Sequence, residues 1–93
     1  ERDILINAVL MASNDDVVTV TQAVPAGGEI CYQREGETFS LAAATDVPLY
    51  HKAALRDLAE GSSVIKYGEH IGHATRPIGR GEHVHTQNLS STL

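Results

Sequence analysis

A glycine-centred pattern, apolar-x-x-Gly-x-x-apolar, occurs three times in this chain and constrains its fold more than any other feature. The copies are Val24…Gly27…Ile30, Leu58…Gly61…Val64 and Ile78…Gly81…Val84. Each copy predicts a turn in which Gly takes a positive φ that other residues resist, while the apolar residues on both sides enter the core. The glycines are 34 and 20 residues apart, so the copies are not solenoid repeats. Chance matches are the alternative, since small β domains contain many such turns.

Short β-branched or apolar runs between the turns predict strands. They occupy residues 4–10, 17–21, 30–33, 38–41, 64–67 and 71–74. The run at 17–21 is the densest in β-branched residues, and the last four runs form two hairpins, each with a glycine in its turn. Residues 48–58 fit either one or two helical turns or a strand through 52–55. Because no segment shows sustained 3.6-residue periodicity, the sequence predicts a compact, mostly β fold with at most one or two short helical turns.

Length and composition predict one small domain that spans residues 1–93. A hydrophobic fraction of 42% supports a packed core and argues against disorder. The chain has three Tyr, one Phe and no Trp, so aliphatic side chains must fill the interior. A deep, fully enclosed active site is difficult to build from so short a chain.

The charge balance excludes two classes of partner. Seven basic residues stand against 12 acidic ones, giving a net charge of −5 with neutral histidines, and no Lys/Arg cluster occurs. A duplex phosphate backbone or an anionic membrane surface requires a basic face, so we expect neither nucleic acid nor membrane as a partner. The apolar run 4–12 is too short to cross a bilayer and has no basic leader. The single Cys31 allows no internal disulfide, which favours a reducing cytoplasm.

Five histidines are present, and His83-x-His85 is the sharpest local motif. If this segment is a strand, the two imidazoles project from one face, because strand side chains alternate with a period of two. Two imidazoles can share a divalent metal, and a third ligand would come from His51, a substrate oxygen or another chain. A solvent-facing strand with polar residues outward fits the motif equally well. We expect His70 and His73 on the surface.

Three separated motifs resemble one enzyme family. They are Asp46–Gly61, Val64–Ala74 and Gly81–Leu89. In this order they are similar to the small SAF-type domain of the altronate and galactarate dehydratase family, which also includes the small subunit of sulfolactate sulfo-lyase. The resemblance covers residues 8–90 and implies a β-clip fold. The family usually has Gly directly before its His-Lys pair, and this chain has Tyr50 there.

The resemblance implies a role in a lyase. The chain would be a small subunit or N-terminal domain of a dehydratase, not active alone, beside a large catalytic subunit. Its substrate would be a sugar acid such as altronate or galactarate, or a related hydroxy acid. We expect His51, Lys52, His83 and His85 to orient this acid, because a Lys can pair with a carboxylate. The alternative for His51 and Lys52 is two exposed polar residues at a turn.

The resemblance also implies a divalent metal, which would be iron, manganese or magnesium, in the assembled enzyme. The candidate ligands that this chain offers are His83 and His85. A divalent metal commonly stabilises the charge that develops when a proton is removed α to a carboxylate.

The sequence leaves other functions open. The chain could be the sulfolactate sulfo-lyase small subunit, a non-catalytic binding module that reuses the β-clip, or an autonomous metal-binding protein. A homo-oligomer is equally compatible with the sequence. The sequence contains no Ser-His-Asp nucleophile arrangement, P-loop, dinucleotide fingerprint or Cys-x-x-Cys pair. These absences count against a complete stand-alone enzyme.

Overall fold

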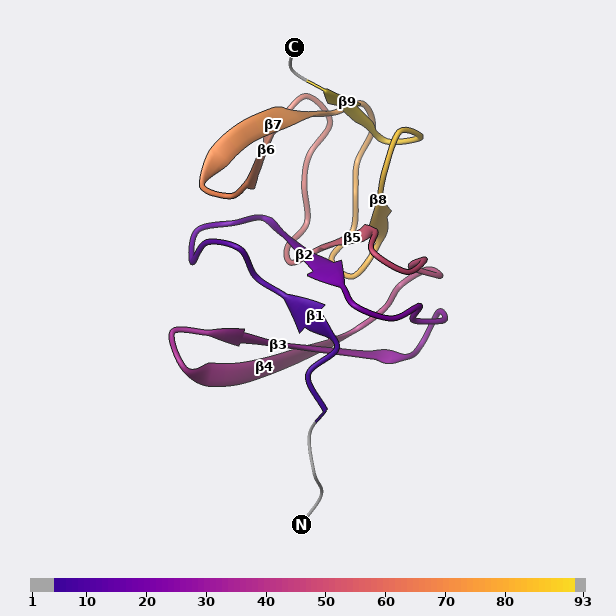
Figure 1. Ribbon diagram of the computed structural model, residues 1–93. Helices are drawn as coiled ribbons and strands as arrows, with labels where there is room; N and C mark the ends of the chain where they lie inside the picture. Colours follow the sequence, from indigo (N-terminus) through magenta and orange to yellow (C-terminus); the bar gives the residue numbers. More distant parts are fainter. Residues whose placement is uncertain (1–4, 92–93) are drawn as a thin grey trace.

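The chain folds into short antiparallel strands, and the computed structural model describes residues 5–91 (Figure 1). The strands are β1 (Ala8–Val9), β2 (Val17–Val20), β3 (Glu29–Arg34), β4 (Glu37–Ala42), β5 (Lys52–Ala54), β6 (Ser63–Lys66), β7 (Glu69–Ala74), β8 (His83–Val84) and β9 (Leu89–Ser91). They form a four-stranded sheet in the order β1-β2-β5-β8, the hairpin β3-β4, and a three-stranded sheet β6-β7-β9. The described residues contain no helix, and therefore none that could cross a membrane.

The predicted mostly β fold is confirmed, and the structure decides two details. Residues 48–58 contain strand β5 and no helical turn, so the strand alternative holds. The predicted opening strand 4–10 is wrong in length, because only Ala8–Val9 pairs with β2, while Leu5 is 80% exposed. Residue 4 lies outside the described residues. Both predicted hairpins form, but the second turn is shorter than expected, because Tyr67, expected in a strand, lies in the turn and β7 already begins at Glu69.

Both hairpins close through two-residue turns in which each central residue has a positive φ. These residues are Glu35 and Gly36, at 49° and 84°, and Tyr67 and Gly68, at 59° and 72°. Two consecutive positive φ values are typical of the type I′ turn, whose twist matches that of the flanking strands. The turn glycines therefore set the register of both hairpins, as expected from the sequence.

The glycine-centred turns are a genuine structural repeat, with one more member than the sequence pattern predicts. Gly27, Gly61 and Gly81 have φ values of 84°, 85° and 86°. A fourth turn, in residues 47–52, has Tyr50 at the equivalent position with φ 65°. The sequence pattern missed this turn because it searched for glycine.

The four turns associate in two pairs, each closed by an isolated β-bridge: Val24 with Val47, and Leu58 with Ile78. In both pairs an Asp side chain caps the opposite turn. Asp46 Oδ1 accepts a hydrogen bond from the backbone N–H of Ala26 at 2.8 Å, and Asp57 Oδ1 accepts one from that of Arg80 at 2.8 Å. The same contact made twice reveals an internal pseudo-duplication of the fold.

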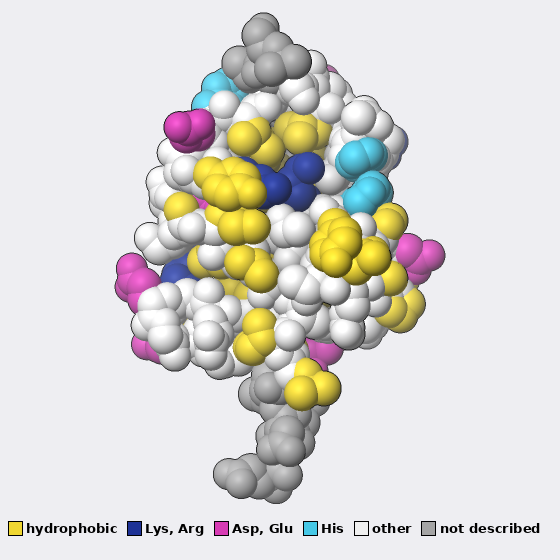
Figure 2. Space-filling view, in the orientation of Figure 1, with side chains coloured by type: hydrophobic (Ala, Val, Ile, Leu, Met, Phe, Trp, Pro, Cys, Tyr) yellow, Lys and Arg dark blue, Asp and Glu magenta, His cyan; other side chains and the backbone are white. Residues whose placement is uncertain are grey.

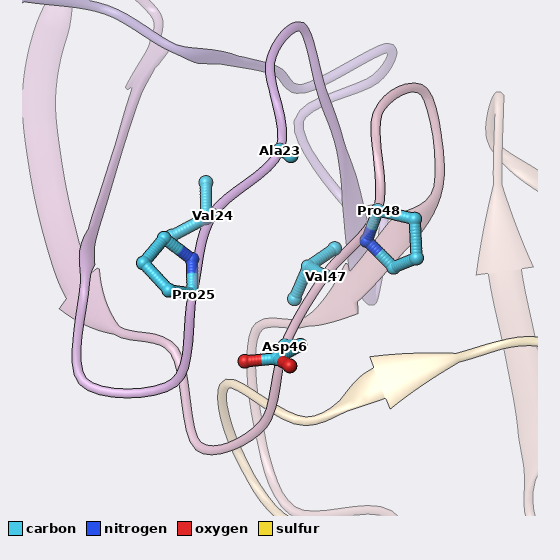
Figure 3. Close-up of a pocket in the computed structure, with 6 residues that line it drawn as sticks. All are labelled: Ala23, Val24, Pro25, Asp46, Val47 and Pro48. Carbon is cyan, nitrogen blue, oxygen red and sulfur yellow. The ribbon is translucent and has the colours of Figure 1, made fainter.

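An open hollow of about 280 Å³ lies between the turns of the first pair (Figure 3). Its lining is Ala23, Val24, Pro25, Asp46, Val47 and Pro48. The lining is almost entirely apolar, and its one carboxylate already caps a turn. None of the site residues predicted from the sequence lines this hollow.

The four-stranded sheet lies between two hydrophobic clusters. On β2, Val18 and Val20 pack in the first cluster and Val17 in the second, while on β5, Ala53 packs in the first and Ala54 in the second. Successive strand residues point to opposite faces, so one sheet serves both clusters. Figure 1 shows the β3-β4 hairpin on one side of this sheet and the β6-β7-β9 sheet on the other. The fold therefore depends on β2 and β5 at its centre.

A matched pair of glycine substitutions tests the role of the turns. Gly61 and Gly81 share φ values of 85° and 86°, but a Cβ on Gly61 would meet nothing within 4 Å, whereas one on Gly81 would collide with the backbone carbonyl of Ala42. We expect Gly61→Ala to lower the free energy of unfolding by about 1 kcal/mol, through its backbone conformation alone. Gly81→Ala should lower it by about 2 kcal/mol more, since the collision adds overpacking strain. Urea denaturation measures both, and equal losses would contradict the packing argument.

Candidate functional site

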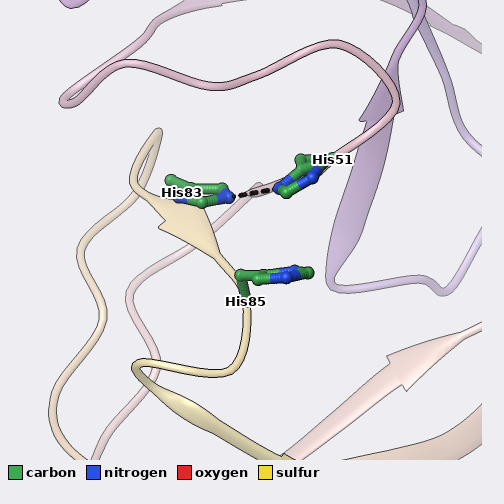
Figure 4. A group of neighbouring side chains, drawn as sticks. All are labelled: His51, His83 and His85. Carbon is green, nitrogen blue, oxygen red and sulfur yellow. Dashed lines mark hydrogen bonds between the residues drawn. The ribbon is translucent and has the colours of Figure 1, made fainter.

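Three histidines converge at strand β8 (Figure 4). His51 directly precedes β5, His83 lies in β8 and His85 directly follows it, and the pairing of Ala53 with His83 brings the two strands together. His51 Nδ1 and His83 Nε2 are 2.8 Å apart, and the ring centroids of His51 and His85 are 4.3 Å apart. The ring planes of His83 and His85 differ by 11°, as expected for side chains on one strand face. One ring nitrogen from each histidine lies within 4.8 Å of the other two.

Gln87 lies beside the His51–His83 pair. Its side-chain nitrogen is 3.3 Å from His83 Nδ1 and 3.3 Å from the His83 carbonyl oxygen. An amide nitrogen only donates, so this contact favours the His83 tautomer that carries its proton on Nε2 and donates it to His51 Nδ1.

Asn88 holds the segment that carries His83 and His85. It is completely buried, its Nδ2 donates to the His83 carbonyl at 2.8 Å, and its Oδ1 accepts from the His85 N–H at 3.0 Å. Its own carbonyl accepts from the N–H of Thr75 at 2.9 Å, which ties this segment to the end of β7. Asn88 is therefore a positioning residue, and the sequence analysis missed it. Its spacing was the available signal, because Asn side chains often bond backbone groups of residues close by in the chain.

Burial and repulsion by neighbouring positive charges favour the neutral forms of His83, His85 and Lys52. Burial, and then the charges of His51, His85 and Lys52, lower the pKa of His83. Burial, and then the charges of His51 and Lys52, lower the pKa of His85. Lys52 is half-buried, and this burial together with the charge of Lys66 lowers the pKa of its ammonium group. A neutral imidazole keeps a lone pair free, which is the form that ligates a metal or accepts a proton.

The three imidazoles form a donor set that fits a divalent transition metal. Two nitrogens bound to one metal at about 2.1 Å lie roughly 3.0–3.4 Å apart, near the 2.8 Å between His51 Nδ1 and His83 Nε2. A metal would therefore replace the shared proton with small ring movements. Imidazole suits iron, whereas magnesium prefers oxygen ligands. Of the three metals expected from the sequence, this donor set favours iron.

The four site residues expected from the sequence lie in one region: His51, His83 and His85 form the cluster, and Lys52 directly follows His51 as the first residue of β5. His70 and His73 are exposed on β7, as the sequence predicts, and neither belongs to the cluster. Cys31 is a buried residue of β3.

Comparisons with known proteins agree with the resemblance noted in the sequence. Residues 6–92 match the sequence model of a family described as the altronate/galactarate dehydratase SAF domain. The chain is 36% identical over 89 residues to the (2R)-sulfolactate sulfo-lyase subunit alpha of Chromohalobacter salexigens, a match that covers 92% of this chain and 95% of that protein. It is 37% identical over 79 residues to the altronate dehydratase of Escherichia coli, covering 85% of this chain but 15% of that protein. The chain thus spans nearly all of the sulfolactate sulfo-lyase subunit alpha and a small part of the altronate dehydratase.

Removing the Asn88 side chain tests its positioning role. Asn88→Ala removes the hydrogen bond to the partly buried His85 N–H and the 2.8 Å bond to the His83 carbonyl, which keeps only its longer contact with Gln87, so we expect the free energy of unfolding to fall by about 2–3 kcal/mol. Gln87→Ala is the control, and its more exposed side chain should change that free energy by less than about 0.5 kcal/mol. Chemical denaturation gives both values. Wild-type stability in Asn88→Ala would show that water replaces the lost contacts.

Proposed function

The chain belongs to the SAF-domain family of altronate and galactarate dehydratases, and we propose that it is the small subunit or N-terminal domain of a lyase acting on hydroxy acids. The observation that carries this proposal is the cluster of His51, His83 and His85 beside Lys52. It combines metal-ligating imidazoles with a cation suited to a carboxylate. Altronate and galactarate are hydroxy acids that offer a carboxylate to the Lys and oxygen ligands to a metal.

A large catalytic partner is part of this proposal. The three histidines of the cluster and Lys52 are only partly buried, and Figure 2 shows His side chains on an open face, beside a Lys or Arg group and hydrophobic side chains. Of the relatives, one is named a subunit alpha, and the other is an altronate dehydratase of which this chain matches 15%. We infer that a large subunit or domain covers this face, and that the chain is not active alone. The enzyme would act in the cytoplasm, because the chain has a single cysteine, Cys31, and therefore no internal disulfide.

The proposed reaction is an elimination next to a carboxylate. A base takes the proton from the α carbon, the electrons of the broken C–H bond form a C=C bond, and hydroxide leaves the β carbon as water. In this scheme Lys52 pairs with the carboxylate and holds the acid against the histidines. The three histidines would hold a divalent metal, whose charge stabilises the negative charge that develops on the carboxylate. The base and the acid for the leaving group would come from the large partner.

A sulfolactate sulfo-lyase small subunit is the second candidate, and one observation favours it. The match to the Chromohalobacter salexigens subunit alpha covers 95% of that protein and 92% of this chain. In this case the same α-proton removal would expel sulfite rather than hydroxide. Lys52 and the histidines would keep the roles given above.

Iron binding tests the metal part of the proposal. We expect the metal-free protein to bind one Fe²⁺ per chain under anaerobic conditions. His51→Ala should weaken this binding by at least about tenfold, because it removes one of three ligands. His70→Ala removes an exposed imidazole outside the cluster and should leave affinity unchanged. Isothermal titration calorimetry measures all three proteins, and absent binding or equal losses in both variants would contradict the metal site.

Activity of the assembled enzyme tests the lyase part. The chain is co-expressed and co-purified with the proposed large dehydratase-like subunit and assayed on altronate, galactarate and sulfolactate. His83→Ala combined with His85→Ala should lower kcat/KM by at least about 100-fold, since it removes groups that hold the substrate or its metal. Circular dichroism checks that the variant folds.

The matched control removes two histidines from another strand. His70→Ala combined with His73→Ala should retain wild-type activity, because both side chains are exposed on β7. Full activity in the variant lacking His83 and His85 would refute the site. Failure of the chain to associate with any large dehydratase-like partner would instead favour a non-catalytic β-clip binding module.

A further inference from the structure

Strand β4 has an outer edge that pairs with no other strand of residues 5–91. It forms a two-stranded sheet with β3 alone, and Figure 1 shows β3 between β4 and β1. Of its six residues, Leu41 is buried and the other five are exposed. The unpaired edge of a strand presents a row of N–H and C=O groups, which another strand can bind.

The outer strands of the other two sheets are protected against such pairing. In the four-stranded sheet these strands are β1 and β8, each two residues long. In the three-stranded sheet they are β9, with three residues, and β6, which has a register shift between Val64 and Ile65 and ends in Lys66. Short strands, bulges and edge lysines are the usual means of blocking edge-to-edge pairing. Strand β4 is six residues long, has no register shift against β3, and contains neither Lys nor Pro.

Asn7 shows which backbone groups of β4 point outward. The Asn7 N–H donates to the Cys31 carbonyl at 3.1 Å, and its Oδ1 accepts from the Cys31 N–H at 2.7 Å. Both backbone groups of Cys31 therefore point away from β4, so Cys31 and its register partner Ser40 form a non-hydrogen-bonded pair. Pairs of the two kinds alternate along antiparallel strands, so Thr38, the register partner of Gln33, belongs to the same kind. The N–H and C=O groups of Thr38 and Ser40 consequently point outward from the hairpin.

The turn of Gly81 covers one end of this edge. A Cβ on Gly81 would collide with the Ala42 carbonyl, so that carbonyl already lies against the turn. The outward groups that remain open are those of Thr38 and Ser40, which lie one on each side of Phe39. A second β4 that runs antiparallel about Phe39 places the Thr38 of each copy opposite the Ser40 of the other. Each of these two pairs can then exchange two backbone hydrogen bonds.

The side chains of β4 complement a second copy in the same register. Phe39 would lie opposite the Phe39 of the other copy, and its ring, 37% exposed, already stacks on Tyr32 with centroids 5.7 Å apart. The second Phe39 would extend this stack, and aromatic cross-strand pairs stabilise antiparallel sheets. On the other face of the strand, the hydroxyls of Thr38 and Ser40 would lie side by side, which is also a favourable cross-strand pair. The edge is therefore complementary to itself in its backbone and on both faces.

We propose that two copies of this chain pair along β4 and join their β3-β4 hairpins into one four-stranded antiparallel sheet, with a twofold axis at Phe39. This inference does not rest on the proposed lyase function. The pairing uses no residue of the histidine cluster, so each copy can still associate with a large partner.

Sedimentation equilibrium of the purified chain tests the dimer. Between about 5 and 500 µM, it should show a reversible monomer–dimer equilibrium with a Kd on the order of 10–100 µM, since the contact is small. Thr38→Lys places a lysine on the edge, and Ser40→Pro removes an outward N–H at a position where a strand edge tolerates proline. Each should weaken the dimer at least about tenfold. Gln33→Lys adds the same charge to the same face of the hairpin but on β3, and should change the Kd by less than about twofold.

Disulfide cross-linking tests the register. In Phe39→Cys the two new thiols face each other across the axis as a non-hydrogen-bonded pair, whose Cα atoms lie about 4.5 Å apart, within disulfide range. Mild oxidation should therefore give a covalent dimer on a non-reducing gel. Glu37→Cys is the control, because in this register it lies opposite Leu41 of the other copy and should stay monomeric on the gel. The native Cys31 is buried and should not cross-link.

Circular dichroism checks that every variant folds. A wild-type chain that stays monomeric at the highest concentration, or a dimer that Thr38→Lys and Ser40→Pro leave unchanged, would overturn the proposal. Cross-linking of Glu37→Cys as fast as that of Phe39→Cys would contradict the register. A monomeric chain whose β4 variants instead lose a large partner would show that this edge binds a different protein. The measurements use neither substrate nor large subunit, so a negative result here leaves the lyase proposal standing.

Discussion

Two adjacent carboxylates, Asp15 and Asp16, hold the two halves of this protein together. Both residues are buried, with exposures of 4% and 7%, and their oxygens accept hydrogen bonds from the backbone N–H groups of Ala12, Ile65, Tyr67 and Gly68 and from Arg56 Nε. Several N–H donors around a buried carboxylate replace the water that it loses on folding. Asp15 thereby fixes the turn of the β6-β7 hairpin, and Asp16 fixes β6, at the start of β2.

Asp15 and Asp16, here called the clasp, and strand β2 together position the candidate site. Lys66 lies between two residues whose N–H groups the clasp binds, so its position relative to β2 is set. On the same strand, Thr19 is the register partner of Lys52. Val20 donates to the His51 carbonyl at 3.0 Å and accepts from the Tyr50 N–H at 3.0 Å. Strand β2 therefore aligns both lysines and one histidine, although it contributes no charged side chain of its own.

The sequence predicted the features that depend on residues close together in the chain, and it missed those that depend on pairing between distant strands. The type I′ hairpin turns and the β-branched strand β2 follow from local preferences, and so does the shared face of His83 and His85. His51 joins them only because β5 pairs with β8, a contact between residues about 30 positions apart that no local pattern encodes. No local pattern indicates that the carboxylates of Asp15 and Asp16 bind a hairpin about 50 residues further along the chain and so join the two halves.

Tyr50 takes a left-handed conformation directly before His51, at a turn position where glycine is easier to accommodate. The three equivalent turns have Gly at this position, and a left-handed conformation costs a residue with a side chain about 1 kcal/mol. Its ring is 70% exposed, so burial within this chain does not offset that cost. A strained, exposed side chain such as Tyr50 is expected beside a candidate site when that side chain contacts another molecule. In the proposed assembly, a partner that covers this face would bury Tyr50 and exclude water from Lys52 and the histidine cluster. Exclusion of water strengthens the attraction between an ammonium group and an anion. In the proposed assembly this exclusion would come from the partner, so the face is open in the isolated chain because its cover belongs to the second component.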